Sequence, residues 1–201
     1  KNIKKEENMT VVRILVISIV LILGIAYMVR FLPGKSKLLL TAREPHFPVV
    51  SGYNLDRQEF EFPRDFAANY NLVIVAFQQH HQNAVNTWIP FVQEIEAFHP
   101  SFVYYELPTI REMNRLYRFF INSGMRSGIP SEETRGRTIT LYIDKEAFDN
   151  ALGIRNEDDI YIYLVKRTGQ ILWQATGQYT EESGESLDDA LETATGHQEE
   201  N

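Results

Sequence analysis

The sequence predicts an α/β fold in which helices flank a mixed sheet, preceded by a hydrophobic segment that can span a membrane. Strand-like and helix-like patterns alternate through residues 47–194. Two strands near the end of that region are joined by the short connection KRTG, which favours an antiparallel hairpin. Residues 14–29 form an apolar run without a charge. Together these features predict one folded domain behind an N-terminal transmembrane helix.

Composition narrows the classes of function. The 201 residues contain no cysteine, which excludes disulfides, thiolate metal sites and thiol redox chemistry. The net charge is −7 and is unevenly distributed: residues 1–44 carry 8 Lys and Arg against 3 Asp and Glu, and the remainder carries 12 against 24. Because an acidic body repels phosphate backbones, we expect no nucleic-acid partner.

The apolar run is long enough for a membrane anchor. It extends over residues 11–32 if Arg13 and Arg30 reach out to the interface, which matches the roughly 20 residues of a spanning helix. A cleaved signal peptide is the alternative, but the run exceeds a usual signal core and no small-x-small cleavage site follows it. We therefore predict an uncleaved anchor that contacts the lipid bilayer. Its residues include Ile14, Leu21 and Val29.

The segments around the anchor complete the expected organisation. Residues 1–10 form a polar N-terminus, residues 33–46 a linker, residues 47–194 the folded domain and residues 195–201 an acidic tail. Basic residues on the two sides of the anchor are equal in number, so they leave the orientation of this single-pass protein open. Analogy with membrane-anchored bacterial proteins of similar fold favours an extracytoplasmic location for the folded domain.

The first half of the domain begins with a hairpin. Residues 47–55 contain a turn signal at Ser51 and Gly52, and the alternating segment QEFEFP follows it. Residues 73–77 are continuously apolar, as in a strand covered on both faces. Apolar residues at helical spacing predict a helix over residues 83–98, with Pro90 inside it as a possible kink.

The second half continues the alternation. Residues 102–107 predict a strand, residues 110–121 a helix, residues 138–143 a strand and residues 145–152 a short helix that Asp144 caps. Two strands at 159–165 and 170–176 then form the closing hairpin, and residues 185–193 predict the last helix. A βαβ core followed by a hairpin makes the sheet mixed.

The segment VIVAFQQHHQNAVNTW is the candidate binding groove. A strand that runs through a short turn into a helix presents free backbone N–H groups, a natural place for a nucleophile or an anion. The turn contains no nucleophile, and Thr87 lies a turn inside the helix. Adjacent histidines diverge on a turn, which disfavours a shared metal ion, so we predict neither metal nor cofactor. The expected groove residues are Gln78, Gln79, His80 and His81.

A loop rich in glycine and arginine precedes the strand at 138–143. Arg126 and Arg137 are candidate residues on the opposite side of the groove, with Arg135 between them. One reading is an anion or carboxylate site formed with the helix start near Asn83. The other is that these arginines pair with nearby acids such as Glu132. Both readings stay open from the sequence.

The order βαβ, hairpin and terminal helix resembles the thioredoxin superfamily. Within it, the segments FPVVSGYNL, VIVAF with NTW, LYIDKEAFDNALGIRNEDDIYIYLV and RTGQILWQATG resemble the mitochondrial ATP synthase assembly factors. The resemblance implies a thioredoxin-like mixed sheet, inner-membrane association and help for the membrane subunit a of the proton channel. The superfamily's redox cysteines sit where this chain has FQQHHQNAVNTW. The anchor and Leu172, where relatives often have a basic residue, are departures.

Two classes of function follow. The first is a redox-inactive binding module on a membrane, an assembly factor or accessory subunit that contacts a membrane protein complex such as ATP synthase. The second is an enzyme or ligand-binding domain, either a peroxiredoxin-like relic or a binder of small anions through the arginine loop. The absence of thiols and of a convincing nucleophile favours the first class, a non-enzyme.

Overall fold

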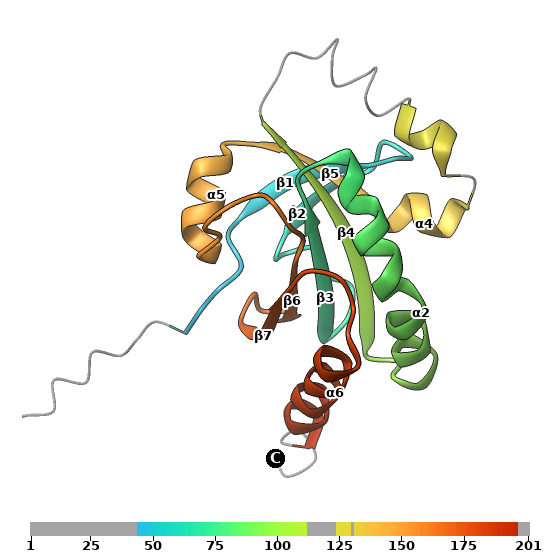
Figure 1. Ribbon diagram of the computed structural model, residues 1–201, viewed down its shortest axis with the longest axis vertical. Helices are drawn as coiled ribbons and strands as arrows, with labels where there is room; N and C mark the ends of the chain where they lie inside the picture. Colours follow the sequence, from blue (N-terminus) through green and yellow to red (C-terminus); the bar gives the residue numbers. More distant parts are fainter. Residues whose placement is uncertain (1–43, 112–123, 130, 197–201) are drawn as a thin grey trace, which may run out of the picture. The chain divides into compact units, whose positions relative to one another are not determined.

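The computed structural model describes residues 44–111, 124–129 and 131–196. Within them, seven strands form one mixed sheet in the order β2-β1-β5-β4-β3-β6-β7 (Figure 1). The strands are β1 (Val50–Asn54), β2 (Glu59–Phe62), β3 (Tyr70–Ala76), β4 (Phe102–Arg111), β5 (Ile139–Ile143), β6 (Tyr161–Lys166) and β7 (Ile171–Thr176). The helices are η1 (Gln79–His81), α2 (Gln82–Phe98), α4 (Glu132–Arg137), α5 (Lys145–Leu152) and α6 (Glu181–Gly196), and residues 124–128 are also helical.

The predicted βαβ and ββα order is confirmed. Strands β3 and β4 are parallel neighbours joined through α2, and β4 pairs in parallel with β5. Strand β6 runs antiparallel to β3, and β7 closes the hairpin with β6. Gly169 adopts a φ of 97° in the hairpin connection, a conformation that glycine takes without steric cost.

The sheet separates two apolar cores. Side chains alternate between the faces of a strand, so Val73 and Val75 of β3 join the core beneath α5, while Leu72 and Ile74 join the core beneath α2 and α6. Figure 1 shows α5 and α2 on opposite sides of the sheet. Burial on both faces explains why β3 is a continuous apolar run.

The N-terminal hairpin differs from the prediction in the position of its turn. Ser51 and Gly52 lie inside β1, and the connection to β2 is residues 55–58. Gly52 is needed for close packing: a Cβ there would lie 2.7 Å from the carbonyl oxygen of Thr140 in β5. The glycine thus marks a close approach between strands, which the sequence pattern alone reads equally well as a turn.

Three element boundaries also differ. Ile110 and Arg111 belong to β4, because Ile110 pairs with Tyr142 of β5; the rest of the predicted 110–121 helix lies outside the described residues. The arginine-rich loop contains the short helix α4, whose Ser131 side chain accepts a hydrogen bond from the Thr134 N–H. Helix α6 begins earlier than predicted, and the Thr180 hydroxyl accepts from the Ser183 N–H there.

Candidate functional site

The polar turn that follows β3 leads directly into α2, as predicted. Gln78, Gln79 and His80 are exposed, whereas His81 is only 3% exposed. Neither η1 nor α2 has a side-chain cap at its start, and neither has an acid in its first turn. The turn therefore offers exposed polar side chains to a ligand, while the N–H groups of His81 and Gln82 already donate to carbonyl groups within the turn.

His81 is a buried part of this turn rather than the solvated residue that the sequence suggests. Its Nδ1 accepts a hydrogen bond from the Phe77 N–H at 3.3 Å. Burial, assisted by the neighbouring His80, lowers the pKa of His81. A neutral ring that accepts at Nδ1 carries its proton on Nε2, and this Nε2 is buried without a hydrogen bond among the described residues. His81 thus helps to hold the turn in place.

The connection before β6 supports the turn from its other side. The Gln78 side chain donates from Nε2 to the carbonyl oxygen of Glu157 at 2.9 Å. Phe77 makes an edge contact with the ring of Tyr161, with centroids 6.2 Å apart. Lys145 of α5 lies over the Phe77 ring, with its Nζ 5.1 Å from the ring centroid, and forms an ion pair with Glu157. The turn is therefore fixed by contacts with both α5 and the 153–160 connection.

Glu106 is a buried acid beside the start of α2. It stands opposite Ile74 in the parallel pairing of β3 and β4 and is 6% exposed. Its carboxylate accepts one long hydrogen bond, 3.4 Å, from Nε2 of Gln82, and no ion pair reaches it in the described residues. Burial raises the pKa of Glu106, and the Gln82 hydrogen bond opposes that rise. The sequence did contain a signal, since this is the one charge within the strand FVYYEL.

A second acid, Asp149 of α5, lies on the other face of the sheet. Its Oδ1 is buried and makes no hydrogen bond in the described structure. Burial and the nearby charge of Glu157 together raise the pKa of Asp149 to about 6, and Lys145 opposes the rise. The sequence patterns singled out neither the buried Glu106 nor the partly buried Asp149.

The structure pairs the arginines of the loop with acids and carbonyl groups. Arg126 lies 3.1 Å from the Asp56 carboxylate and donates to the Leu55 carbonyl oxygen at 2.8 Å. Arg135 reaches the same Asp56 at 3.1 Å. Of the two readings of this loop, the pairing with acids matches these contacts, although Asp56 comes from the N-terminal hairpin.

Arg137 lies along the far part of α2 rather than at its start. It pairs with Glu96 at 2.5 Å and with Glu133 at 2.7 Å, and its guanidinium is 4.7 Å from the Tyr104 ring centroid. Glu96 is 14 residues beyond Gln82, about 21 Å along a helix axis that rises about 1.5 Å per residue. The structure therefore does not bring Arg137 to the polar turn.

The described part of the chain contains neither a metal-binding cluster nor a membrane-spanning helix. No group of three or more His, Cys, Asp or Glu side chains suited to a metal ion occurs among residues 44–111, 124–129 and 131–196. No helix in the same ranges is long and apolar enough to cross a membrane. The predicted anchor, residues 11–32 with Ile14, Leu21 and Val29, lies outside them.

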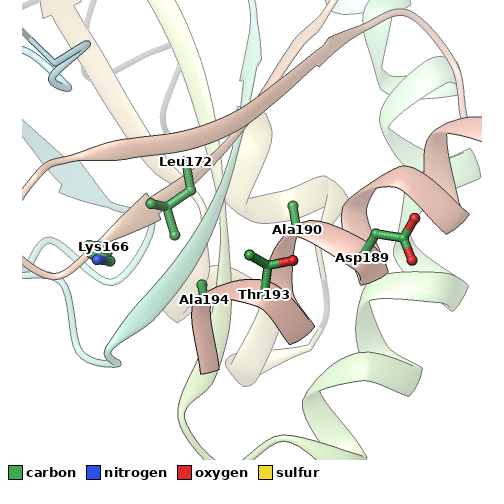
Figure 2. A pocket seen from close by; sticks show the side chains of 6 residues that line it. All are labelled: Lys166, Leu172, Asp189, Ala190, Thr193 and Ala194. Carbon is green, nitrogen blue, oxygen red and sulfur yellow. The ribbon is translucent and has the colours of Figure 1, made fainter. Parts of the chain in front are cut away.

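An open groove of about 430 Å³ lies away from the polar turn, between the closing hairpin and α6 (Figure 2). Figure 2 shows Leu172 of β7 reaching towards the helix, with Ala190, Thr193 and Ala194 facing it. Lys166 and Asp189 stand at its margins. The groove has no buried polar group among these lining residues that would select a ligand.

The arrangement of β3–α2–β4 and β6–β7–α6 defines a thioredoxin-like fold. A protein of Aquifex aeolicus VF5 described as an electron transfer protein matches it with a TM-score of 0.52 and 10% identity, over 76% of this chain and 98% of that chain. BsSco, a member of the Sco family of cytochrome c oxidase assembly proteins, matches with a TM-score of 0.50 and 10% identity, over 76% and 95%. At these identities the likeness concerns the fold alone.

Sequence comparison identifies the family within that fold. The model of the ATP10 protein family matches residues 36–193, so the chain belongs to this family of ATP synthase assembly factors. A thiol:disulfide interchange protein from Bacteroides sp. is also similar, at 16% identity over 75% of this chain and 88% of that one, with a TM-score of 0.47. A search of curated proteins gives no match. Family membership confirms the resemblance drawn from the sequence.

Proposed function

We propose that this protein is a membrane-anchored, redox-inactive binding module that assists the assembly of the ATP synthase membrane sector. The observation that carries the proposal is the chemistry of the turn before α2. The thioredoxin-like domain has the exposed Gln78, Gln79 and His80 and the buried His81 where its superfamily places redox cysteines, and the chain has no cysteine. Polar amides and an exposed imidazole suit reversible hydrogen bonding to a polypeptide, and they offer no nucleophile for thiol chemistry.

The expected anchor would help this binding module to capture its partner at the membrane. Residues 11–32 would hold the domain at the membrane surface, where the client subunits are inserted. Tethering through a short linker raises the effective concentration of a partner to roughly millimolar. Weak contacts at the polar turn are then sufficient for capture and release, which is what a transient assembly factor requires.

The first experiment identifies the partner. The tagged full-length chain is extracted from its membranes in mild detergent and purified, and the co-purifying proteins are identified by mass spectrometry. We expect enrichment of ATP synthase subunits at less than one copy of this chain per complex. Stoichiometric presence in the finished enzyme would indicate a permanent subunit, and absence of every synthase subunit would refute the proposal.

A double variant tests the binding face. Gln79→Ala with His80→Ala removes two exposed side chains, so capture should fall while thermal stability stays unchanged. His81 is left intact because it is buried and supports the turn. The matched control is His99→Ala, which removes an imidazole at the other end of α2. Equal capture by both variants would move the binding face elsewhere on the domain.

A further inference from the structure

Glu106 has a position that folding alone does not explain. Along β4 the residues facing α2 are Phe102, Tyr104 and then Glu106, so an apolar side chain would continue the core. A buried carboxylate without a counter-ion costs free energy of folding, and such groups concentrate at functional sites. Among the described residues its only hydrogen-bond partner is the amide of Gln82.

The carboxylate lies one side chain below the surface. Gln82 is exposed, and its Nε2 reaches Glu106 at 3.4 Å and the Asn86 side chain at 3.0 Å. Rotation of the Gln82 side chain would break the long bond to Glu106 and the exposed bond to Asn86, and water can replace the second of these. That rotation would open the carboxylate to a group arriving over the first turn of α2. The amide thus occupies the place in which a stronger, charged donor would fit.

We infer that Glu106 receives a lysine or arginine side chain of the client, which displaces the Gln82 amide as the client segment crosses the start of α2. This inference rests on the proposed binding function and names the chemistry of the partner. A cation at this position forms a charge-assisted hydrogen bond in a partly desolvated site. The surrounding domain favours its approach, since residues 45–201 carry twice as many acidic as basic side chains.

The polar turn supplies the remaining contacts for such a segment. Asn83 and Asn86 are exposed on the first two turns of α2, which follow Gln79 and His80 of η1. Their amides and imidazole can donate to and accept from a peptide backbone without regard to its side chains. Glu106, whose buried carboxylate lies near this end of α2, therefore provides the specificity for a basic side chain of the client.

The test is photo-crosslinking of the full-length chain in its native membranes. A p-benzoylphenylalanine at Asn83 is irradiated, and the crosslinked peptides are mapped by mass spectrometry. We expect a client segment with a lysine or arginine close to the crosslinked residue. Glu106→Gln should lower the crosslink yield by about tenfold, whereas Glu94→Gln, which removes an exposed carboxylate from α2, should not.

A second variant guards against a folding defect in Glu106→Gln. Gln82→Arg supplies a guanidinium from the chain itself, so it should raise the melting temperature and block the same crosslink. Ala97→Arg adds the same charge at an exposed position further along α2 and should block nothing. Wild-type yield in both Glu106→Gln and Gln82→Arg, or a crosslinked segment without a basic residue, would overturn the inference.

The crosslink and the purification separate the two claims. If ATP synthase subunits co-purify but no crosslink forms from Asn83, the proposed function stands and the Glu106 inference is wrong. If a basic segment crosslinks in a Glu106-dependent way but belongs to no synthase subunit, the recognition chemistry stands and the proposed client is wrong.

Discussion

Trp88 connects the helix that bears the site to the closing part of the fold, and Trp88→Phe measures the strength of that connection. Trp88 is fully buried in α2, and its Nε1 donates to the Gly177 carbonyl oxygen at 2.9 Å. Its ring contacts Tyr179 at 5.3 Å and Trp173 at 6.2 Å between centroids. The phenyl ring keeps part of the packing but leaves the Gly177 carbonyl group without this donor.

The expected loss follows from these two contributions. An unsatisfied buried carbonyl costs about 1–3 kcal/mol, and the missing ring atoms cost about 1–2 kcal/mol in lost burial. We therefore expect the free energy of unfolding to fall by about 3 kcal/mol. For a domain of this size each kcal/mol corresponds to about 2–4 °C, so the melting temperature should fall by about 6–12 °C.

Urea unfolding of the full-length chain, followed by circular dichroism, measures the change. Trp173→Phe is the matched control, because Trp173 is only partly buried and its Nε1 donates to the exposed Ser186 hydroxyl at 2.9 Å. It should cost about 1 kcal/mol. A smaller loss for Trp88→Phe than for Trp173→Phe would refute the reasoning that the Gly177 contact holds α2 in place.

Three further predictions concern the sheet, the buried acid and an ion pair. Gly52→Ala should destabilise the domain by about 2 kcal/mol in denaturant titrations because its Cβ would meet the neighbouring strand, while Gly136→Ala, which meets no atom within 4 Å, should not. The pKa of Asp149 is higher in the folded state than in the unfolded state, so the stability of the wild-type protein should rise as pH falls through about 6. In calorimetry, Asp149→Asn should be about 1 kcal/mol more stable than the wild type at pH 7.5 and should lose that advantage near pH 4. Arg137→Met leaves the partly buried Glu96 unpaired and should lower the unfolding free energy by about 1–2 kcal/mol, an effect absent if Glu96 is neutralised as well.

The elements that the sequence predicted correctly are those encoded by local patterns. The apolar run of β3, the helical spacing in α2 and the glycine connection between β6 and β7 each specify a structure within a few residues. Asp144 was predicted as a cap, and its carboxylate accepts from the N–H groups of Glu146 and Ala147. Local hydrogen bonds and periodicity explain these successes, because neighbouring residues supply both partners.

The residues whose contacts the sequence did not predict depend on partners far along the chain. Gly52 reads as a turn residue until β5 comes to lie against it. Arg126 was placed opposite the polar turn, yet its partners come from the connection between β1 and β2. Arg137 was placed there too, and it pairs with Glu96 along α2. An arginine side chain can reach many acids, and its sequence position does not choose among them.

Residue type and local order are enough to specify the alternation of strands and helices, the absence of thiol chemistry and the polar turn at the start of α2. The packing of the folded domain buries His81 and places Glu106 beneath Gln82, with no counter-ion among the described residues. Burial and pairing are set when the sheet brings β3, β4 and α2 together, and the free energy of a charged group depends on that surrounding rather than on its neighbours in sequence.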